Sequence, residues 1–118
     1  MFNISNNGII TVNRGDTFTL NVFVNVGTKL FPVQYVLQEG DNLYFALCEP
    51  NQPFEDALIR KVFTHTDVDE KGNVVMKFDS EMAEFLLPGT YYYTIKLVKA
   101  SDESVTTIIT KTKFVIIE

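Results

Sequence analysis

The sequence is poor in the residue types that most enzymes and metal sites use. Its 118 residues include one cysteine, one histidine and no tryptophan. Four zinc ligands of the Cys or His kind therefore do not exist, and a lone cysteine excludes an internal disulfide. A nucleophilic dyad would need Cys48 and His65 within hydrogen-bond reach, which nothing in their spacing supports. We predict no catalytic residues, cofactor or metal, and interpret Cys48 as a small buried apolar side chain.

Long apolar runs and clusters of positive charge are also missing. No stretch approaches the ~18 apolar residues needed to cross a bilayer, and residues 1–7 lack the blocks of a secretory signal. The ten basic residues are scattered, and the formal net charge is −5. Because phosphate backbones and anionic lipids attract clustered Lys and Arg, we expect neither nucleic acid nor a membrane as a direct partner.

What the sequence does have is apolar surface. Hydrophobic residues make up 46% of the chain, including ten Phe and five Tyr. That surface is sufficient to offset the entropy lost on ordering, and the length suits one core. We therefore predict a single folded domain over residues 1–118.

Strand patterns dominate this domain. Residues 17–26 alternate apolar and polar side chains, which is typical of a half-buried strand. Phe23 interrupts the polar face; it either contacts a partner or packs under a loop, and packing is the favoured interpretation. Residues 43–48 are apolar on both faces, which predicts a central strand. Further strands are predicted over 8–12, 58–64, 74–78, 91–97 and 105–117.

Turn signals separate these strands. Arg14-Gly15-Asp16 spells an integrin-binding tripeptide, but a glycine that permits a tight turn before a strand explains it better. Pro32 cannot donate to a sheet ladder, so the segment around it belongs at an edge or in a crossing loop. Ser80 can cap a single helical turn over 80–86. Pro88 and the glycine after it would stop that turn.

The acidic segment 67–73 contains another turn signal. It resembles the start of a calcium loop, but Lys71 stands at a ligand position and Phe78 stands where a bidentate Glu is required. A solvated turn is the better interpretation. We expect it to join strands 58–64 and 74–78 as an antiparallel hairpin.

About seven short strands without a long helix predict an immunoglobulin-like antiparallel β-sandwich with one short helical turn. In such sandwiches a tyrosine early in a late strand hydrogen-bonds back across the corner that precedes it. Alternation directs Tyr91 and Tyr93 inward, whereas the spacing of fibronectin-type domains selects Tyr92. The sequence leaves open which ring forms the corner.

Three stretches carry a family resemblance: 10–18 (Ile-Thr-Val-Asn-Arg-Gly-Asp-Thr-Phe), 40–45 (Gly-Asp-Asn-Leu-Tyr-Phe) and 89–97 (Gly-Thr-Tyr-Tyr-Tyr-Thr-Ile-Lys-Leu). Together with 107–109 and the hydrophobic residues at the end of the sequence, they resemble small phage and prophage proteins. These proteins are similar to the N-terminal immunoglobulin-like domain of phage baseplate upper proteins. That pattern usually carries Asp where this chain has Thr94.

The resemblance implies a virion structural protein of a tailed bacteriophage, assembled in the bacterial cytoplasm. Such a protein acts as a capsid decoration or as a tail or baseplate adaptor. It contacts other virion proteins, in multiple copies on a symmetric particle. A carbohydrate- or host-surface-binding sandwich is the alternative, although the chain lacks the tryptophan most often used for sugar stacking.

Docking to other proteins should use exposed sheet faces, strand edges or terminal arms. The expected arms are 1–7 and 114–118. Aromatic side chains contribute disproportionately to interfaces. The interface candidates are Phe2, Phe23, Phe31, Phe54 and Tyr92.

Overall fold

The structure is a computed structural model that describes residues 3–4, 8–28, 30–53, 57–79, 86–101 and 103–118. Within these residues it contains strands and one short 3-10 turn, and no helix long and apolar enough to cross a membrane. The elements are β1 (Asn3–Ile4), β2 (Ile10–Asn13), β3 (Phe18–Val22), β4 (Asn42–Cys48), β5 (Ile59–Phe63), η2 (His65–Asp67), β6 (Val74–Phe78), β7 (Gly89–Val98) and β8 (Val105–Ile117). The predicted all-β class is confirmed.

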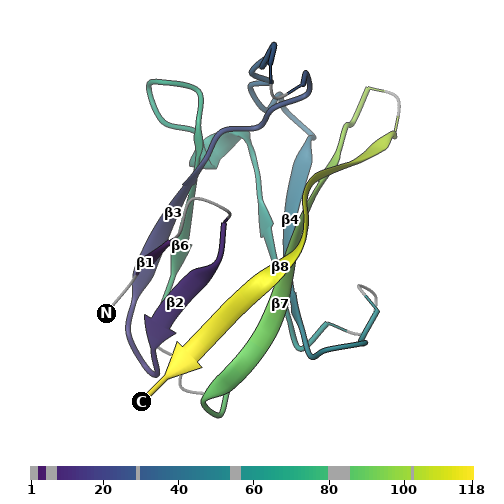
Figure 1. Cartoon of the computed structure of the whole chain (residues 1–118). Coiled ribbons are helices and arrows are strands. Elements are labelled where there is room, and N and C mark those ends of the chain that lie inside the picture. Colours follow the sequence, from purple (N-terminus) through teal and green to yellow (C-terminus); the bar gives the residue numbers. More distant parts are fainter. Residues whose placement is uncertain (1–2, 5–7, 29, 54–56, 80–85, 102) are drawn as a thin grey trace.

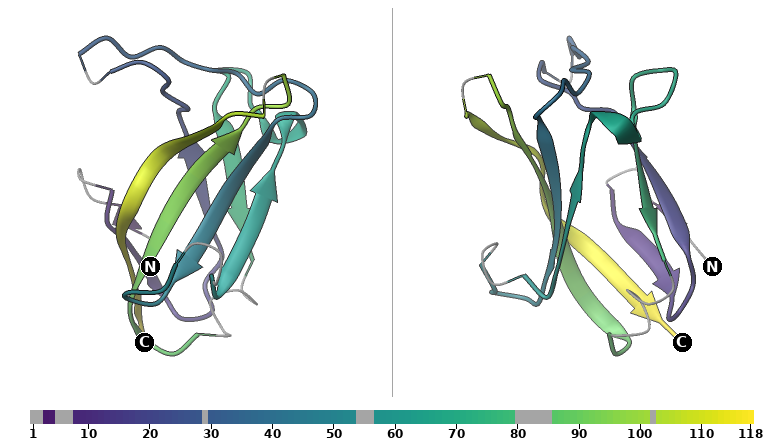
Figure 2. Two further views of the ribbon diagram at one scale, coloured as in Figure 1. Left: turned by 90° about the vertical axis from the view of Figure 1, so that its right-hand side faces the viewer. Right: turned by 180° about the vertical axis from the view of Figure 1, so that it is seen from behind.

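The strands form two layers. Six of them make one sheet in the order β1-β2-β8-β7-β4-β5, and β3 pairs with β6 in a second sheet. Figures 1 and 2 show β3 and β6 packed across from the larger sheet. Because the chain crosses repeatedly from one sheet to the other, the arrangement is that of an immunoglobulin-like sandwich.

The last strand lies at the centre of the larger sheet. β8 pairs antiparallel with β7 and parallel with β2, so one pair departs from the expected antiparallel pattern. Phe114 and Ile116 of β8 are fully buried. The expectation that 114–118 forms a free docking arm is therefore wrong, because its apolar alternation is used to fill the core. Within the opposite arm, Asn3 and Ile4 pair with β2.

The strands on either side of the acidic turn belong to different sheets. β5 pairs with β4, whereas β6 pairs with β3. The predicted hairpin between 58–64 and 74–78 is therefore wrong. The chain does reverse locally, since Val68 bridges Val74, but η2 first carries it across to the other layer. β5 and β6 pair with strands of different sheets, and the sequence within either strand does not specify its pairing partner.

Aromatic rings fill the space between the layers. Phe18 and Phe78 of the small sheet stack with their centroids 4.6 Å apart. Phe45 of the large sheet lies 4.8 Å from Phe78 and 5.6 Å from Tyr93. All four side chains are buried. Each such ring removes a large apolar area from water, so this aromatic core is the main tie between the sheets.

The tyrosine corner is made by Tyr91. Its hydroxyl donates to the carbonyl oxygen of Leu87, four residues upstream, over 2.7 Å. Tyr93 also points inward, but its hydroxyl donates to the carbonyl oxygen of Gly8, just before β2 of the same sheet, over 2.5 Å. Burial raises the pKa of Tyr93. Tyr92, between them, faces the opposite side of the sheet.

Two local predictions concern turns. Gly15 adopts φ 84°, and the amide of Asp16 donates to the carbonyl of Asn13 over 3.2 Å. This confirms the tight turn between β2 and β3. The predicted helical turn 80–86 lies outside the described residues except for Leu86, which is buried.

Candidate protein-docking site

The longest connection between described strands, the β3–β4 loop (residues 23–41), folds back on itself as an irregular hairpin. The amide of Tyr35 donates to the carbonyl of Val24 over 2.8 Å, and that of Val26 donates to Val33 over 2.9 Å. Asn25 and Gln34 form a bridge between these two rungs. Figure 2 shows the hairpin projecting from one end of the sandwich. The loop therefore continues the fold beyond the sheets.

Polar side chains fix the turn of this hairpin. The side-chain oxygen of Asn25 accepts from the amides of Gly27 and Val33 over 2.8 and 3.0 Å. The hydroxyl of Thr28 accepts from the amide of Phe31 over 3.0 Å. A side chain at Gly27 would collide with the carbonyl oxygen of Phe31 and the amide of Val33. The turn conformation thus depends on glycine at that position.

The hairpin is also attached to the small sheet. The side-chain amide of Gln34 donates to the carbonyl of Lys71 over 2.9 Å and to the side-chain oxygen of Asn73 over 3.1 Å. These residues belong to the turn that leads into β6. Since Gln34 stands in the middle of the hairpin, its two bonds couple the loop to the turn before β6.

A buried carboxylate holds the base of the loop. Asp41 is 2% exposed and accepts from the hydroxyl of Tyr35 over 2.5 Å and from the amides of Gln38 and Ala100 over 2.8 and 2.9 Å. Burial raises the pKa of Asp41, but these hydrogen bonds and the charge of Lys99 outweigh it and leave the pKa below its ordinary value. Lys99 also lies 4.6 Å above the Tyr35 ring. Asp41 thereby ties the loop to the β7–β8 turn.

The outer surface of this ordered loop is apolar. Leu30 and Phe31 at its tip are 86% and 78% exposed, and Val33 beside them is 54% exposed. The other exposed apolar residues of the loop are Phe23, Val26 and Val36. Apolar residues exposed singly are normal on a protein, but a contiguous group of them marks an interaction surface.

Two of the five interface candidates belong to this loop. Phe31 lies at its tip, and Phe23 lies at its start with 47% of its surface exposed. The favoured interpretation that Phe23 packs under a loop is therefore wrong. Tyr92 lies half-buried on the outer face of the six-stranded sheet. Phe2 and Phe54 lie outside the described residues.

Several apolar members of the loop were not among the candidates. Leu30, Val33 and Val36 are aliphatic, whereas the predicted interface residues are all aromatic. A signal was nevertheless present, because Pro32 removes this apolar segment from the sheets. Apolar residues that cannot join a sheet must either pack on it or remain exposed.

The two residues considered for a nucleophilic dyad lie far apart. Cys48 ends β4 beyond the rung that pairs Leu47 with Ile59, whereas His65 follows β5 beyond the rung that pairs Phe63 with Leu43. At ~3.3 Å per strand residue, this separates them by more than about 15 Å. Cys48 is buried, as predicted, and its thiol contacts the carbonyl of Pro53 at 3.7 Å. The two side chains cannot form a dyad in this fold.

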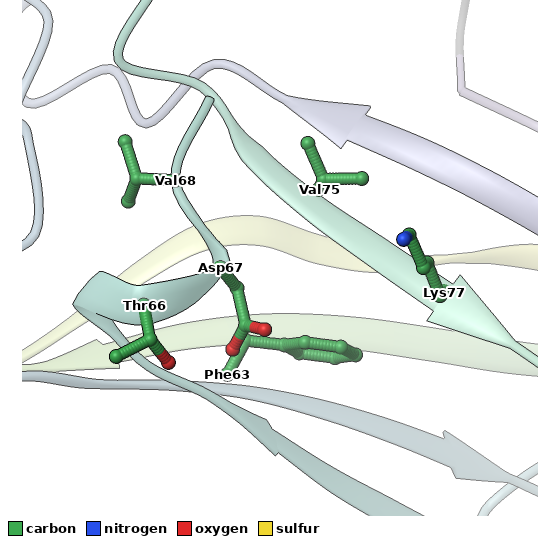
Figure 3. A pocket seen from close by; sticks show the side chains of 6 residues that line it. All are labelled: Phe63, Thr66, Asp67, Val68, Val75 and Lys77. Atoms are coloured by element: carbon green, nitrogen blue, oxygen red, sulfur yellow. The ribbon is translucent and has the colours of Figure 1, made fainter. Parts of the chain in front are cut away.

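A cavity of about 390 Å³ opens between the two sheets beside η2 (Figure 3). It is lined by Phe63, Thr66, Asp67, Val68, Val75 and Lys77. The carboxylate of Asp67 accepts from the amide of Thr64 over 2.9 Å and so caps the 3-10 turn. The polar members of this lining are Thr66, Asp67 and Lys77, and the Asp67 carboxylate is engaged by the Thr64 amide. The cavity has the size of a ligand pocket.

The acidic turn after η2 uses the carboxylate of Asp69 internally. Asp69 accepts from the amides of Lys71 and Asn73 over 2.9 and 3.0 Å. These bonds stabilise the chain reversal, as expected for a solvated turn. No group of three potential metal-binding side chains occurs among the residues that the structure describes.

Comparison of the chain with protein-family models, with curated proteins and with solved structures finds no match.

Proposed function

We propose that this domain is a non-enzymatic structural protein of a tailed-phage particle, which binds a neighbouring virion protein through the β3–β4 loop. The observation that carries the proposal is the exposed apolar tip formed by Leu30, Phe31 and Val33 on a hydrogen-bonded hairpin.

The tip has the energetic properties of an interface anchor. Burying one Leu or Phe side chain completely is worth roughly 1.5–3 kcal/mol. Binding usually loses part of such a gain because it must order the loop that carries the side chain. Here the hydrogen bonds of Asn25, Thr28 and Gln34 already order the backbone. More of the burial energy of Leu30 and Phe31 is then available for affinity.

The shape of the partner follows from the shape of the tip. A narrow projecting hairpin with two large apolar side chains at its end fits a concave apolar pocket, where anchors of this kind contribute most. A flat partner surface would cover less of Leu30 and Phe31. We therefore expect a pocket on the neighbouring protein, rimmed by groups that meet the polar backbone of the hairpin.

The virion setting is supported by the sequence stretches that resemble small phage and prophage proteins. A compact sandwich with one projecting loop suits either a capsid decoration or a tail or baseplate adaptor, since each needs one stable body and one docking site. Assembly in the bacterial cytoplasm, and multiple copies on a symmetric particle, are parts of the same proposal.

Cryo-electron microscopy of intact particles from the host that encodes the chain, combined with immunogold labelling, tests the proposal. The expected result is density for the sandwich on the shell or tail, with the tip around Phe31 seated in a neighbouring protein. Particles that carry the chain on neither shell nor tail would refute the virion role. Density with the tip in solvent would refute the docking site alone.

A further inference from the structure

Charge is divided unevenly between the strands and the loops. Although 15 of the 118 residues are acidic, none of the strands that the structure describes contains an Asp or Glu. The strands of the six-stranded sheet carry five basic residues: Arg60, Lys61, Lys96, Lys111 and Lys113. The sheet is thus basic in a chain that is acidic overall.

Four of these five cations share the outer face of the sheet. Phe45 and Leu47 of β4 point into the core, so their neighbours Tyr44, Ala46 and Cys48 point outward, although Ala46 and Cys48 are covered by neighbouring residues and only Tyr44 is partly exposed. The cross-strand partners of the outward residues must also point outward. These partners include Arg60 opposite Ala46, Lys96 opposite Tyr44 and Tyr92 opposite Cys48. Lys61, by contrast, points inward and lies over the Phe78 ring.

The two remaining cations flank Tyr92. Lys113 pairs directly with Tyr92 across β7 and β8, and the Lys111 ammonium lies 5.3 Å from the centroid of the Tyr92 ring. Lys111 and Lys113 are both exposed. We call the surface formed by Arg60, Lys96, Lys111 and Lys113, with Tyr44 and Tyr92 between them, the outer basic face.

The spacing of these cations suits an extended peptide. Strands lie ~4.8 Å apart and alternate residues ~6.7 Å apart along a strand, so Arg60, Lys96 and Lys113 have Cα atoms roughly 12–16 Å from one another. An extended segment of about six residues covers that span. Its carboxylates would meet ammonium and guanidinium groups, and the Tyr44 and Tyr92 hydroxyls could donate to them.

We propose that the outer basic face binds a short acidic segment of a partner protein. This inference is independent of the β3–β4 loop. A long polyanion such as nucleic acid fits less well: four positive charges lie on this face, and the rest of a chain of net charge −5 therefore has a net charge of −9. A chain that extends more than about one Debye length, ~8 Å, beyond the face meets that repulsive surface, whereas a short segment does not.

Fluorescence anisotropy with a labelled hexaglutamate peptide tests the proposal on the full chain. Hexaglutamine with the same label controls for contacts that need no charge. A labelled single-stranded oligothymidylate longer than the face provides the nucleic-acid comparison. We expect hexaglutamate to bind at low salt, hexaglutamine not to bind, and the affinity for hexaglutamate to fall as salt rises.

Two triple variants with the same net charge locate the binding. K96Q/K111Q/K113Q removes three charges from the outer basic face, and R14Q/K71Q/K77Q removes three charges from elsewhere on the molecule. The first should weaken hexaglutamate binding by about ten-fold or more, and the second by less than about two-fold. The L30S/F31S variant should bind hexaglutamate like the wild type, which separates this face from the proposed docking loop.

Four outcomes would overturn the inference. They are no hexaglutamate binding by the wild type, equal binding of hexaglutamine, equal loss in the two triple variants, and tighter binding of the oligothymidylate than of hexaglutamate. Urea denaturation of each variant establishes that it is folded. If K96Q/K111Q/K113Q fails to fold, the single variant K113Q, on an exposed position, is compared with K77Q instead.

Discussion

The aromatic core and the tip of the β3–β4 loop use similar side chains in opposite surroundings. Phe45 and Phe78 are buried with their rings 4.8 Å apart, whereas Phe31 leaves 78% of its surface in water. Yet the backbone around Phe31 is hydrogen-bonded on both sides of the hairpin. Phe31 is therefore exposed because the hydrogen-bonded hairpin holds it away from the core. Core substitutions should therefore cost stability, and tip substitutions should cost binding.

The largest expected effect is in the core. Phe45→Ala should lower the free energy of unfolding by about 3–5 kcal/mol, because it removes the ring that contacts both Phe78 and Tyr93. Urea denaturation followed by circular dichroism measures the change. A loss below about 1 kcal/mol would mean that the two layers are not held together by this cluster.

The next effect concerns the anchor at the base of the loop. Asp41→Asn should cost about 1–3 kcal/mol at neutral pH, since an amide cannot accept all three hydrogen bonds. The Asp41 pKa is lowered on folding from 3.8, so its stabilisation is fully present above that value. The stabilisation is lost as the pH falls through the folded-state pKa.

Urea titrations at neutral pH and below pH 4 check this dependence. The wild type should lose stability on acidification, and Asp41→Asn should lose less over the same range because it lacks this ionisation. An identical acid dependence of the two proteins would show that Asp41 is not the group responsible.

A smaller effect separates the two inward tyrosines. Tyr93→Phe should lower stability by about 1 kcal/mol, because it leaves the Gly8 carbonyl without its hydroxyl donor. Tyr91→Phe removes the corner bond to Leu87 in a more exposed setting, so its cost should be smaller. Thermal denaturation of both variants in parallel decides the order. The reverse order would make the corner the more important of the two bonds.

The smallest effect on stability should come from the tip. Leu30→Ser combined with Phe31→Ser should change the free energy of unfolding by no more than about 0.5 kcal/mol, since both side chains are already in water. Val62→Ser combined with Val105→Ser, at positions 49% and 63% exposed, is the matched control. A loss of several kcal/mol in the tip variant alone would show that the tip packs against the domain.

The sequence predicted the strands well because their burial patterns are local. Alternation in 91–97 and the doubly apolar run 43–48 reappear as buried faces of β7 and β4. The alternation predicted over 17–26 is a buried face of β3 only as far as Val22; residues 23–26 belong to the loop, where Val26 is exposed. Pairing was harder. Residues 58–64 and 74–78 flank a good turn signal, but each finds its apolar partner on a different sheet. No pattern within either strand records that partner.

The docking site was predicted only in part, for a related reason. Phe31 stood out as an aromatic residue in a segment that Pro32 keeps out of the sheets. The fate of Phe114 and Phe23 depended on tertiary packing: one fills the core, and the other faces water. An apolar residue near a chain end or on a polar face has the same local sequence pattern whether it is buried in the core or exposed to water.

The comparison between core and tip is tested most directly by the incorporation of variants into particles. Particles are produced with the wild-type chain, with L30S/F31S or with V62S/V105S, and the amount of the chain per particle is measured by quantitative immunoblotting. We predict that L30S/F31S, at unchanged stability, falls by about ten-fold or more, while V62S/V105S stays at the wild-type amount. Normal incorporation of a folded L30S/F31S would contradict the assignment of the β3–β4 loop as the docking site.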